Sequence, residues 1–474
     1  MTKVLRLSEM IFRPRGTLAR RFVHAVISIT LRLFFRRIEV SEVERVPSSE
    51  PLIFVLNHPN GLIDPGLVFV SLPRRVSFLA KSTLFRLPIV GFALRTLEAL
   101  PLYRRVDVSS EPSADAARNV ALNQRTFEAC HKLLQNNRCI ALFPEGISHN
   151  STYLLPLKTG AARIALGALS FDPQNDHNID LLKIVPVGLY YTSKTSFRSE
   201  ALLSFGEPFG VSRVELDAEG QPPRKEVGEL SEKIATKLRE VTLNVENTAA
   251  LEVVERTEQL FSSVYESLNL RMSLSDELDL RRRFAAEIEE LETREPERAA
   301  LLTKRVANYE QRLRELGVSV EHLSVTKHST WYVFRHFILR IALILAFLPL
   351  TIIGMIIHLP AYLACLIFAR FFRQHGPDQS GGSIKILAAM ILMPLTWIVA
   401  TTIIFFNWIW QAALVALPLI ILCGYVALRC LEELVDLRGW FAAIWVLLGH
   451  RTLFIKLLLE RRALHREIAA LVNN

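Results

Sequence analysis

The spacing of hydrophobic positions changes along the chain, and between residues 51 and 212 short apolar runs alternate with stretches of helical periodicity. The runs expected to be strands are LIFVL, VSFLA, ALPLY, CIALF, KIVPVGLYY and LLSF, and helices are expected around residues 65–72, 84–97, 115–135 and 157–169. Such alternation is typical of an α/β fold with a largely parallel sheet. We therefore predict one α/β domain over residues 49–214.

The next region, residues 215–330, is highly charged and contains few strand signals. An apolar stripe there steps by four, three, four and three positions through Leu302, Val306, Tyr309, Leu313 and Leu316. This is the period of an amphipathic helix. The stretch LSDELDLRRRFAAEIEELE is the expected antiparallel partner, so we predict a helical segment without chemistry of its own.

Two apolar runs dominate residues 331–474, and neither 341–369 nor 386–428 contains Asp, Glu, Lys or Arg. The second run fits two membrane helices of about 20 residues each, with a turn near residues 407–410. The first run is too long for one upright helix and too short for two. Basic residues flank every run, and by the positive-inside rule they prefer the cytosol: Arg335, Arg340, Arg370, Arg373, Lys385, Arg429 and Arg438.

We therefore predict that both runs are hairpins and that a basic helix ends the chain. The first would be a shallow re-entrant hairpin broken near residues 349–354, with one long tilted span as the alternative. His358 lies inside that run, where ionisable side chains often have a function, but a packed neutral histidine is the favoured interpretation. The protein is expected to be a multi-pass membrane protein with its α/β domain facing the cytosol.

Near the N-terminus, residues 13–37 contain only ten consecutive uncharged residues, too few to cross about 30 Å of hydrocarbon. Arginines flank this stretch, and phenylalanines lie among them. For residues 1–48 we predict a basic helix that lies on the surface of an anionic membrane. An ordinary packed helix with a solvated basic face is the alternative.

Composition agrees with a membrane protein, since 50% of the 474 residues are hydrophobic and the mean hydropathy is +0.26. The formal net charge is +9, and residues 1–106 alone hold 17 basic and 7 acidic residues. A basic face suits phosphate groups on lipids or metabolites, whereas no basic patch interleaved with aromatic residues favours nucleic acid. The five cysteines show no zinc-type spacing, so we expect free thiols, a reducing compartment and no metal site.

Chemistry is first suggested by NHPNGLID, residues 57–64, which follows the expected strand LIFVL. His58 and Asp64 are six positions apart and would not share a face of a regular helix, but Pro59 and Gly61 allow a turn. A carboxylate that accepts from one ring nitrogen leaves the other free to take a proton from a hydroxyl. The pair can be a catalytic base with its orienting acid, or part of an ordinary strand-to-helix connection.

Two further motifs follow strands in a similar way, and a third begins a helix. LFPEGISHN places Glu145 and Gly146 where backbone N–H groups can hold an anion or an oxyanion. EALPLYRR ends in Arg104 and Arg105, two fixed cations that suit a phosphate. Lys158 stands at the start of an expected helix and is another phosphate candidate.

Taken in order, NHPNGLID, ALPLYRR, FPEG and KIVPVGLYY resemble the four sequence blocks of the glycerolipid acyltransferase superfamily, which includes lysophosphatidate and glycerol-phosphate acyltransferases. The usual first block has four residues between His and Asp, and this one has five. That spacing, the stretch FPEGISHNSTYLLPLKTGAARIAL, the charged helices and the C-terminal apolar runs resemble the fungal-type branch of dual glycerol-3-phosphate/dihydroxyacetone-phosphate acyltransferases. The resemblance covers most of residues 50–430.

The resemblance implies an acyltransferase-type domain that needs no cofactor. A fatty acyl group would pass from a thioester of coenzyme A or acyl carrier protein to the sn-1 hydroxyl of glycerol 3-phosphate or dihydroxyacetone phosphate. His58 would be the general base, and Asp64 would orient its ring. The remaining block residues would bind substrate: Arg104, Arg105 and Lys158 the phosphate, Glu145 and Gly146 the acceptor and oxyanion, with Pro186 in the fourth block.

Two other functions stay open. A lysophosphatidate acyltransferase acting at sn-2 would bind an acceptor that already has a tail, and the five-residue spacer argues against it. A non-enzymatic lipid-binding protein on the same fold would be favoured by loss of the motif His, Asp, Arg or Glu, and all four are present. His149, next to FPEG, is either a substrate contact or a polar loop residue.

Overall fold

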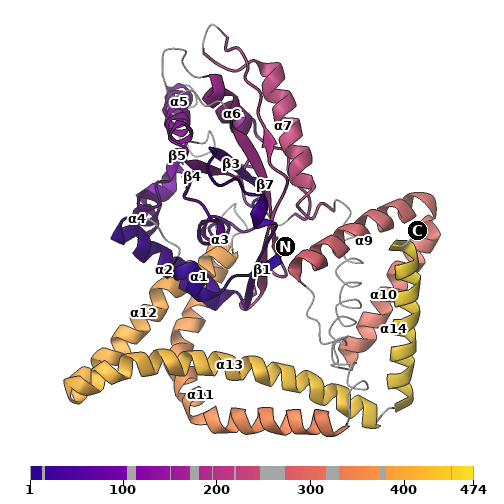
Figure 1. The fold of residues 1–474 in the computed structure, drawn as a ribbon. Coiled ribbons are helices and arrows are strands. Elements are labelled where there is room, and N and C mark those ends of the chain that lie inside the picture. The colour runs from indigo at the N-terminus through magenta and orange to yellow at the C-terminus, as the bar shows by residue number, and fades with distance from the viewer. Residues whose placement is uncertain are drawn as a thin grey trace. The chain divides into compact units, whose positions relative to one another are not determined.

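The computed structural model describes residues 2–12, 16–103, 114–149, 151–170, 181–194, 196–217, 220–245, 273–316, 330–373, 381–449 and 451–472. The chain divides into two compact units (Figure 1). The first contains Met1–Asn244 with His375–Ser383, and the second contains Val245–Gln374 with Ile384–Asn474.

Within the described residues, nine strands of the first unit form one sheet. They are β1 (Thr2–Val4), β2 (Arg37–Ser41), β3 (Leu52–Leu56), β4 (Val76–Lys81), β5 (Leu100–Leu102), β6 (Cys139–Leu142), β7 (Lys183–Tyr191), β8 (Glu200–Phe205) and β9 (Phe209–Gly210). Their order is β1-β2-β8-β7-β3-β6-β4-β5, with β9 paired to β7. All pairs from β7 to β5 are parallel, as are β2 and β8, whereas β1–β2, β7–β8 and β7–β9 are antiparallel. The predicted α/β domain with a largely parallel sheet is confirmed.

Helices pack on the sheet in two groups, which Figure 1 shows on opposite sides of it. The first group is α5 (Ala114–Gln135), α6 (Gly160–Ser170) and α7 (Arg224–Arg239). The second group is α1 (Leu7–Phe12), α2 (Leu18–Phe34), α3 (Ile63–Ser71) and α4 (Pro88–Thr96). Two short 3₁₀ helices, η1 (Val43–Arg45) and η2 (Ser82–Arg86), lie in the connections. Alternate residues of β3 pack on opposite faces of the sheet. Ile53 and Val55 belong to the core between the sheet and α5 to α7, whereas Phe54 contacts the ring of Phe205. Because both faces are covered, β3 is apolar throughout, and the strands and helices predicted between residues 51 and 212 are all present.

The predicted boundaries near residues 48 and 214 are not boundaries of this unit. Residues 1–48 contribute β1 and β2 to the sheet, and the unit continues through α7, which packs on α6 and β7. The sequence hides β2 because Arg37 and Glu39 interrupt its apolar pattern. In the structure these two side chains pair at 3.1 Å, and Arg37 also pairs with Glu200 of β8 at 2.8 Å. The ion pairs let two charged residues enter the sheet.

Helix α2 has two apolar stripes: one packs as the alternative interpretation expected, and the predicted position on a membrane surface stays a prediction. One stripe is buried and includes Val23, Leu31 and Phe34, and α2 contacts α3 and α4. The other stripe is exposed to between 40% and 82%: Leu18, Phe22, Ile29 and Leu33. A soluble packed helix does not need the second stripe.

The second unit consists of six described helices: α9 (Leu274–Arg294), α10 (Pro296–Glu315), α11 (Thr330–Arg373), α12 (Gly381–Asn407), α13 (Trp410–Gly449) and α14 (Arg451–Val472). Helices α9 and α10 contact each other, and α14 joins both. The predicted amphipathic stripe is confirmed, since Leu302, Val306, Tyr309 and Leu313 are buried. The expected basic C-terminal helix corresponds to α14, whose Glu460 pairs with Arg312 of α10 at 2.9 Å.

Three described helices are long and apolar enough to cross a membrane: residues 337–371 of α11, 385–407 of α12 and 410–446 of α13. The turn predicted near residues 407–410 is confirmed, because α12 ends at Asn407 and α13 begins at Trp410. The break predicted near residues 349–354 is wrong, because α11 is one continuous helix with Pro349 and Pro360 inside it. In an apolar environment a proline bends a helix and loses one backbone bond, whereas a full break would leave several peptide groups without partners. Figure 1 shows α11 bent rather than broken.

His358 is a packed histidine, as the sequence favoured. Its Nδ1 donates to the carbonyl oxygen of Gly354 at 2.9 Å, and Trp397 Nε1 donates to its Nε2 at 2.9 Å. Both ring nitrogens are therefore used within the packing of α11 and α12. A neutral imidazole satisfies both bonds.

Candidate active site

His58 stands at the carboxyl end of β3, the edge where open α/β sheets bind their ligands. The turn that follows β3 is tied to β7 by Asn57, whose side chain exchanges two hydrogen bonds with the backbone of Leu189, at 3.0 and 2.7 Å. Gly61 in this turn has φ = 45°, a left-handed conformation that favours glycine. The turn brings the His58 side chain back over the start of α3.

The His58 ring meets Asp64, with 2.8 Å between Nδ1 and Oδ2. Asp64 is completely buried, and two more donors reach it: the Asn60 N–H to Oδ2 at 2.7 Å and the Tyr191 hydroxyl to Oδ1 at 2.6 Å. An ionised carboxylate only accepts, so Nδ1 carries the ring proton and Nε2 has the free lone pair. The ring is 14% exposed and stacks on Phe143 with 4.2 Å between ring centroids. The structure thus brings the predicted pair together with Nε2 free to act as a base.

Glu145, in the turn after β6, ties several loops of the site together. Its carboxylate is fully buried. Oε1 accepts from the backbone N–H of His58 at 2.8 Å, and Oε2 accepts from the N–H of Leu155 at 3.0 Å and contacts the ring of His149. Both oxygens are therefore occupied, and Glu145 positions the backbone that carries His58.

Gly146 and Lys158 lie directly against each other. Gly146 has φ = 74°, and a Cβ added there would lie 2.7 Å from Lys158 Nζ. The backbone N–H of Lys158 donates to the carbonyl of Pro144 at 2.8 Å, which holds the chain leading into α6 beside the FPEG turn. The exposed Lys158 ammonium therefore lies over this turn, where it can meet an anion.

Three predicted residues remain. Arg104 and Arg105 fall outside the described residues, which stop at Tyr103 after β5. Pro186 is buried in the middle of β7, opposite Val55 of β3. It thus lies inside the sheet, whereas His58, Glu145 and Lys158 lie in loops.

Two residues join the site that no sequence block identified as functional. Tyr191 ends β7 and holds Asp64; burial and the Asp64 carboxylate raise the pKa of its hydroxyl well above the ordinary value, so it stays a donor. Lys194 follows three residues later, and its Nζ donates to the carbonyl of His149 at 3.4 Å. Burial lowers the pKa of Lys194, against the attraction of Asp64 and Glu145. Because β7 runs parallel to β3, residues that follow β7 reach the same edge as His58.

Backbone hydrogen bonds join Lys194 and His149 to the turn that follows β3. The carbonyl of Lys194 accepts from the Asn60 side-chain amide at 2.8 Å, and the N–H of His149 donates to the His58 carbonyl at 3.2 Å. The site therefore offers a base with cationic groups around it, an arrangement suited to deprotonating a hydroxyl on an anionic substrate. Within the described residues, no group of three or more His, Cys, Asp or Glu side chains could hold a metal ion.

Comparison with known protein families covers most of the chain. The Acyltransferase family matches residues 37–190, which include β2 to β7 and the His58 and Glu145 turns. The family described as Glycerol-3-phosphate acyltransferase 2 C-terminal domain matches residues 258–474. The second match begins beyond the compact sheet unit and includes α9 to α14.

Individual relatives agree with these matches. The chain is 29% identical to Glycerol-3-phosphate O-acyltransferase 2 of Saccharomyces cerevisiae over 288 residues, which are 58% of this chain and 37% of that protein. It is 28% identical to Glycerol-3-phosphate O-acyltransferase 1 of the same yeast over 369 residues, 61% of this chain and 47% of that protein. A chloroplastic 1-acyl-sn-glycerol-3-phosphate acyltransferase of Brassica napus is 27% identical over 151 residues, 31% of this chain and 39% of that protein.

The chain spans less than half the length of each of these relatives. The yeast proteins match over a larger share of the chain than the plant protein does. The resemblance noted in the sequence blocks is confirmed: residues 37–190 are similar to the Acyltransferase family, and residues 258–474 are similar to the Glycerol-3-phosphate acyltransferase 2 C-terminal domain.

Proposed function

We propose that this protein is a membrane-bound O-acyltransferase that moves a fatty acyl group from an acyl thioester to the sn-1 hydroxyl of glycerol 3-phosphate. The His58–Asp64 dyad carries the proposal, because its free Nε2 lies at the ligand-binding edge of an acyltransferase domain. The C-terminal match and the two yeast relatives support glycerol 3-phosphate as the acceptor. Dihydroxyacetone phosphate, which has a hydroxyl and a phosphate in comparable places, is a second acceptor.

The proposed reaction is a direct transfer. His58 Nε2 takes the proton of the acceptor hydroxyl while the hydroxyl oxygen attacks the thioester carbonyl carbon. The C–S bond then breaks, the thiolate leaves, and the imidazolium returns its proton to the thiolate or to solvent. Asp64 stabilises the imidazolium between these steps. Holding the two substrates together suffices for an activated thioester, so neither a covalent acyl-enzyme nor a cofactor is needed.

Binding of the acceptor phosphate is proposed for two basic residues that follow β5 in the sequence and for two that lie near the dyad. Arg104 and Arg105 follow β5, which lies at the far end of the parallel strands from β7. Lys158 lies over the FPEG turn, and Lys194 lies beside His149. Fixed cations at the carboxyl edge of a sheet suit a phosphate dianion. The acyl donor is a thioester of coenzyme A or of acyl carrier protein.

The acceptor preference tests this proposal. Purified membranes that contain the full chain are offered labelled glycerol 3-phosphate, dihydroxyacetone phosphate or lysophosphatidate, each with acyl coenzyme A and then with acyl carrier protein. We expect kcat/KM to be higher for glycerol 3-phosphate or dihydroxyacetone phosphate than for lysophosphatidate. If lysophosphatidate is the better acceptor, the sn-1 assignment fails and the protein is an sn-2 acyltransferase. If no acceptor is acylated, the lipid-binding alternative replaces both.

We further propose that the protein is a multi-pass membrane protein with its catalytic domain in the cytosol. Three apolar helices support membrane association, and the exposed stripe of α2 suits a lipid surface. Basic residues stand at both ends of the apolar part of α11, at Arg335 and Arg373. Its internal prolines let α11 bend, so both ends can stay on the cytosolic side.

Cysteine labelling tests this topology. In intact cells, a cysteine introduced between α11 and α12, at residues 374–380, should stay unlabelled by an impermeant thiol reagent, and one introduced at Asn407 should be labelled. Permeabilised cells provide the control, because both positions should then react. Strong labelling of residues 374–380 from outside would show that α11 crosses the membrane once.

A further inference from the structure

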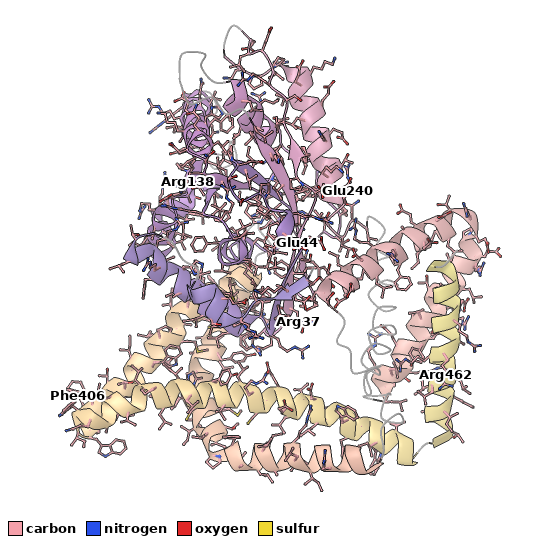
Figure 2. All side chains as sticks on the ribbon, viewed as in Figure 1. Arg37, Glu44, Arg138, Glu240, Phe406 and Arg462 are labelled. Atoms are coloured by element: carbon pink, nitrogen blue, oxygen red, sulfur yellow. The ribbon has the colours of Figure 1, made fainter. Side chains whose placement is uncertain are left out.

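A second basic site lies at the edge of the sheet opposite His58. Arg75 directly precedes β4, Glu98 stands shortly before β5, and Arg138 directly precedes β6, so these residues share the amino ends of three neighbouring parallel strands. Arg75 and Arg138 each contact one oxygen of the Glu98 carboxylate. Arg20 of α2 lies over the ring of Phe69 in α3, the helix that leads to Arg75 and β4, and the charges of the other three residues act on its pKa. We call these four residues the Arg20 cluster; Arg138 is labelled in Figure 2.

Arg20 is buried without the partners that a guanidinium normally has. Its side chain is 4% exposed and lies over the ring of Phe69, with 5.3 Å from Cζ to the ring centroid. Its Nη1, like Nε of Arg138, is buried and has no hydrogen-bond partner among the described residues. Burial lowers the pKa of Arg20, and the charges of Arg75 and Arg138 lower it further. A buried cation with unused donors is costly unless an acceptor meets it.

Among the described residues, the surrounding protein does not supply this acceptor. Glu98 is already shared by two arginines. Backbone carbonyls at this edge of the sheet are taken by Arg74, whose guanidinium donates to three of them. His24, one turn after Arg20, faces Ser28, and burial together with the Arg20 charge lowers the pKa of His24 to about 4. His24 is therefore neutral at physiological pH and adds neither an anion nor a second cation.

We propose that the Arg20 cluster binds an anion of the phosphate class, either a free phosphate or the phosphate of an anionic lipid headgroup. The cluster contains three guanidinium groups and one carboxylate, so it has excess positive charge, and the planar guanidinium fork matches phosphate oxygens. The cluster opens to solvent through Arg75 and Glu98, which are 39% and 37% exposed. The exposed apolar stripe of α2 favours a lipid as the source, because it would place the same helix against a membrane. The site is distinct from the proposed acceptor site at the opposite edge of the sheet and does not depend on the proposed reaction.

Anion-dependent thermal unfolding of the full chain in mild detergent tests this site. The midpoint is measured against increasing inorganic phosphate, with chloride at equal ionic strength as the reference. A second arm compares dioctanoyl phosphatidate with dioctanoyl phosphatidylcholine. The variants are Arg75→Gln, Arg138→Gln and Glu98→Gln, with Arg45→Gln as the matched control, because Arg45 pairs only with Glu42 and Glu207 in the described structure.

We expect a saturable stabilisation of the wild type and of Arg45→Gln. The apparent Kd for the anion should be about tenfold higher in Arg75→Gln and Arg138→Gln, because each loses one charge-assisted contact. It should be severalfold lower in Glu98→Gln, which loses the competing carboxylate. Stabilisation by both phosphate and phosphatidate identifies a site for the free anion, and stabilisation by phosphatidate alone identifies a headgroup site. The proposal is overturned if no probe stabilises the wild type. It is also overturned if the arginine variants respond like the wild type, because the anion then binds elsewhere, for example at the acceptor site. A weaker response of Glu98→Gln would likewise overturn it, because that is the behaviour of an ordinary ion-pair network.

Discussion

Replacing His58 with alanine should lower the turnover number for acyl transfer by about a hundredfold or more, the usual contribution of a positioned general base. His58 Nε2 is the free base of the dyad, and alanine removes it together with the stacking on Phe143. The backbone N–H of residue 58 still donates to Glu145, so the turn is kept. The measurement is kcat with glycerol 3-phosphate in membranes that contain known amounts of the variant.

The control for His58→Ala is His465→Ala, a histidine on α14 in the other unit, which should leave turnover unchanged. Folded protein is quantified by gel filtration in detergent and by thermal unfolding. Loss of activity and of folded protein in the same proportion would assign His58 a structural role. Full activity of His58→Ala would remove the base from the proposed reaction.

The strands and helices around the active site could be predicted because their packing leaves a strong mark on the sequence. A parallel strand covered on both faces is apolar at every position, as in β3, and it stands out against the polar turn that follows. The motif turns could be placed for a related reason, since His58 and Glu145 each follow such a strand and both strands end at one edge. Because β3 and β6 are neighbouring parallel strands, the residues that follow them, His58 and Glu145, lie close together.

Other features could not be predicted, because their causes lie far away in the sequence. Strand β2 depends on an ion pair between Arg37 and Glu200, which are 163 positions apart. Tyr191 holds Asp64 from 127 positions away, and nothing local marks it as part of the site. One signal was available for the position of Tyr191 and Lys194: ligands bind at the carboxyl ends of parallel strands, and both residues lie at the end of the predicted strand KIVPVGLYY or follow it. Their contacts in the site could not be predicted in this way. Helix α11 was misjudged because the positive-inside rule describes loops and does not say whether Pro349 breaks or bends a helix.

Replacing Asp64 with asparagine should lower turnover by on the order of a hundredfold to a thousandfold, whereas Tyr191→Phe should lower it by less than about tenfold. The Asp64 carboxylate supplies the negative charge that stabilises the imidazolium formed when His58 takes a proton. An amide of the same shape keeps one acceptor for Nδ1 but loses that charge. Phenylalanine at position 191 leaves the charge and the 2.8 Å bond to His58 in place and removes one donor from Oδ1.

The two variants therefore separate catalysis from stability. Tyr191→Phe leaves a buried carboxylate oxygen without its donor, which should lower the free energy of unfolding by about 1–3 kcal/mol while most of the turnover remains. Asp64→Asn should show the opposite balance, with a large loss of kcat and a smaller change in unfolding, because the Asn60 N–H still finds an acceptor oxygen. Both quantities are measured on the same detergent-purified preparations. If Asp64→Asn keeps more than a tenth of the wild-type kcat, the carboxylate only shapes the turn, and His58 acts without a charged partner.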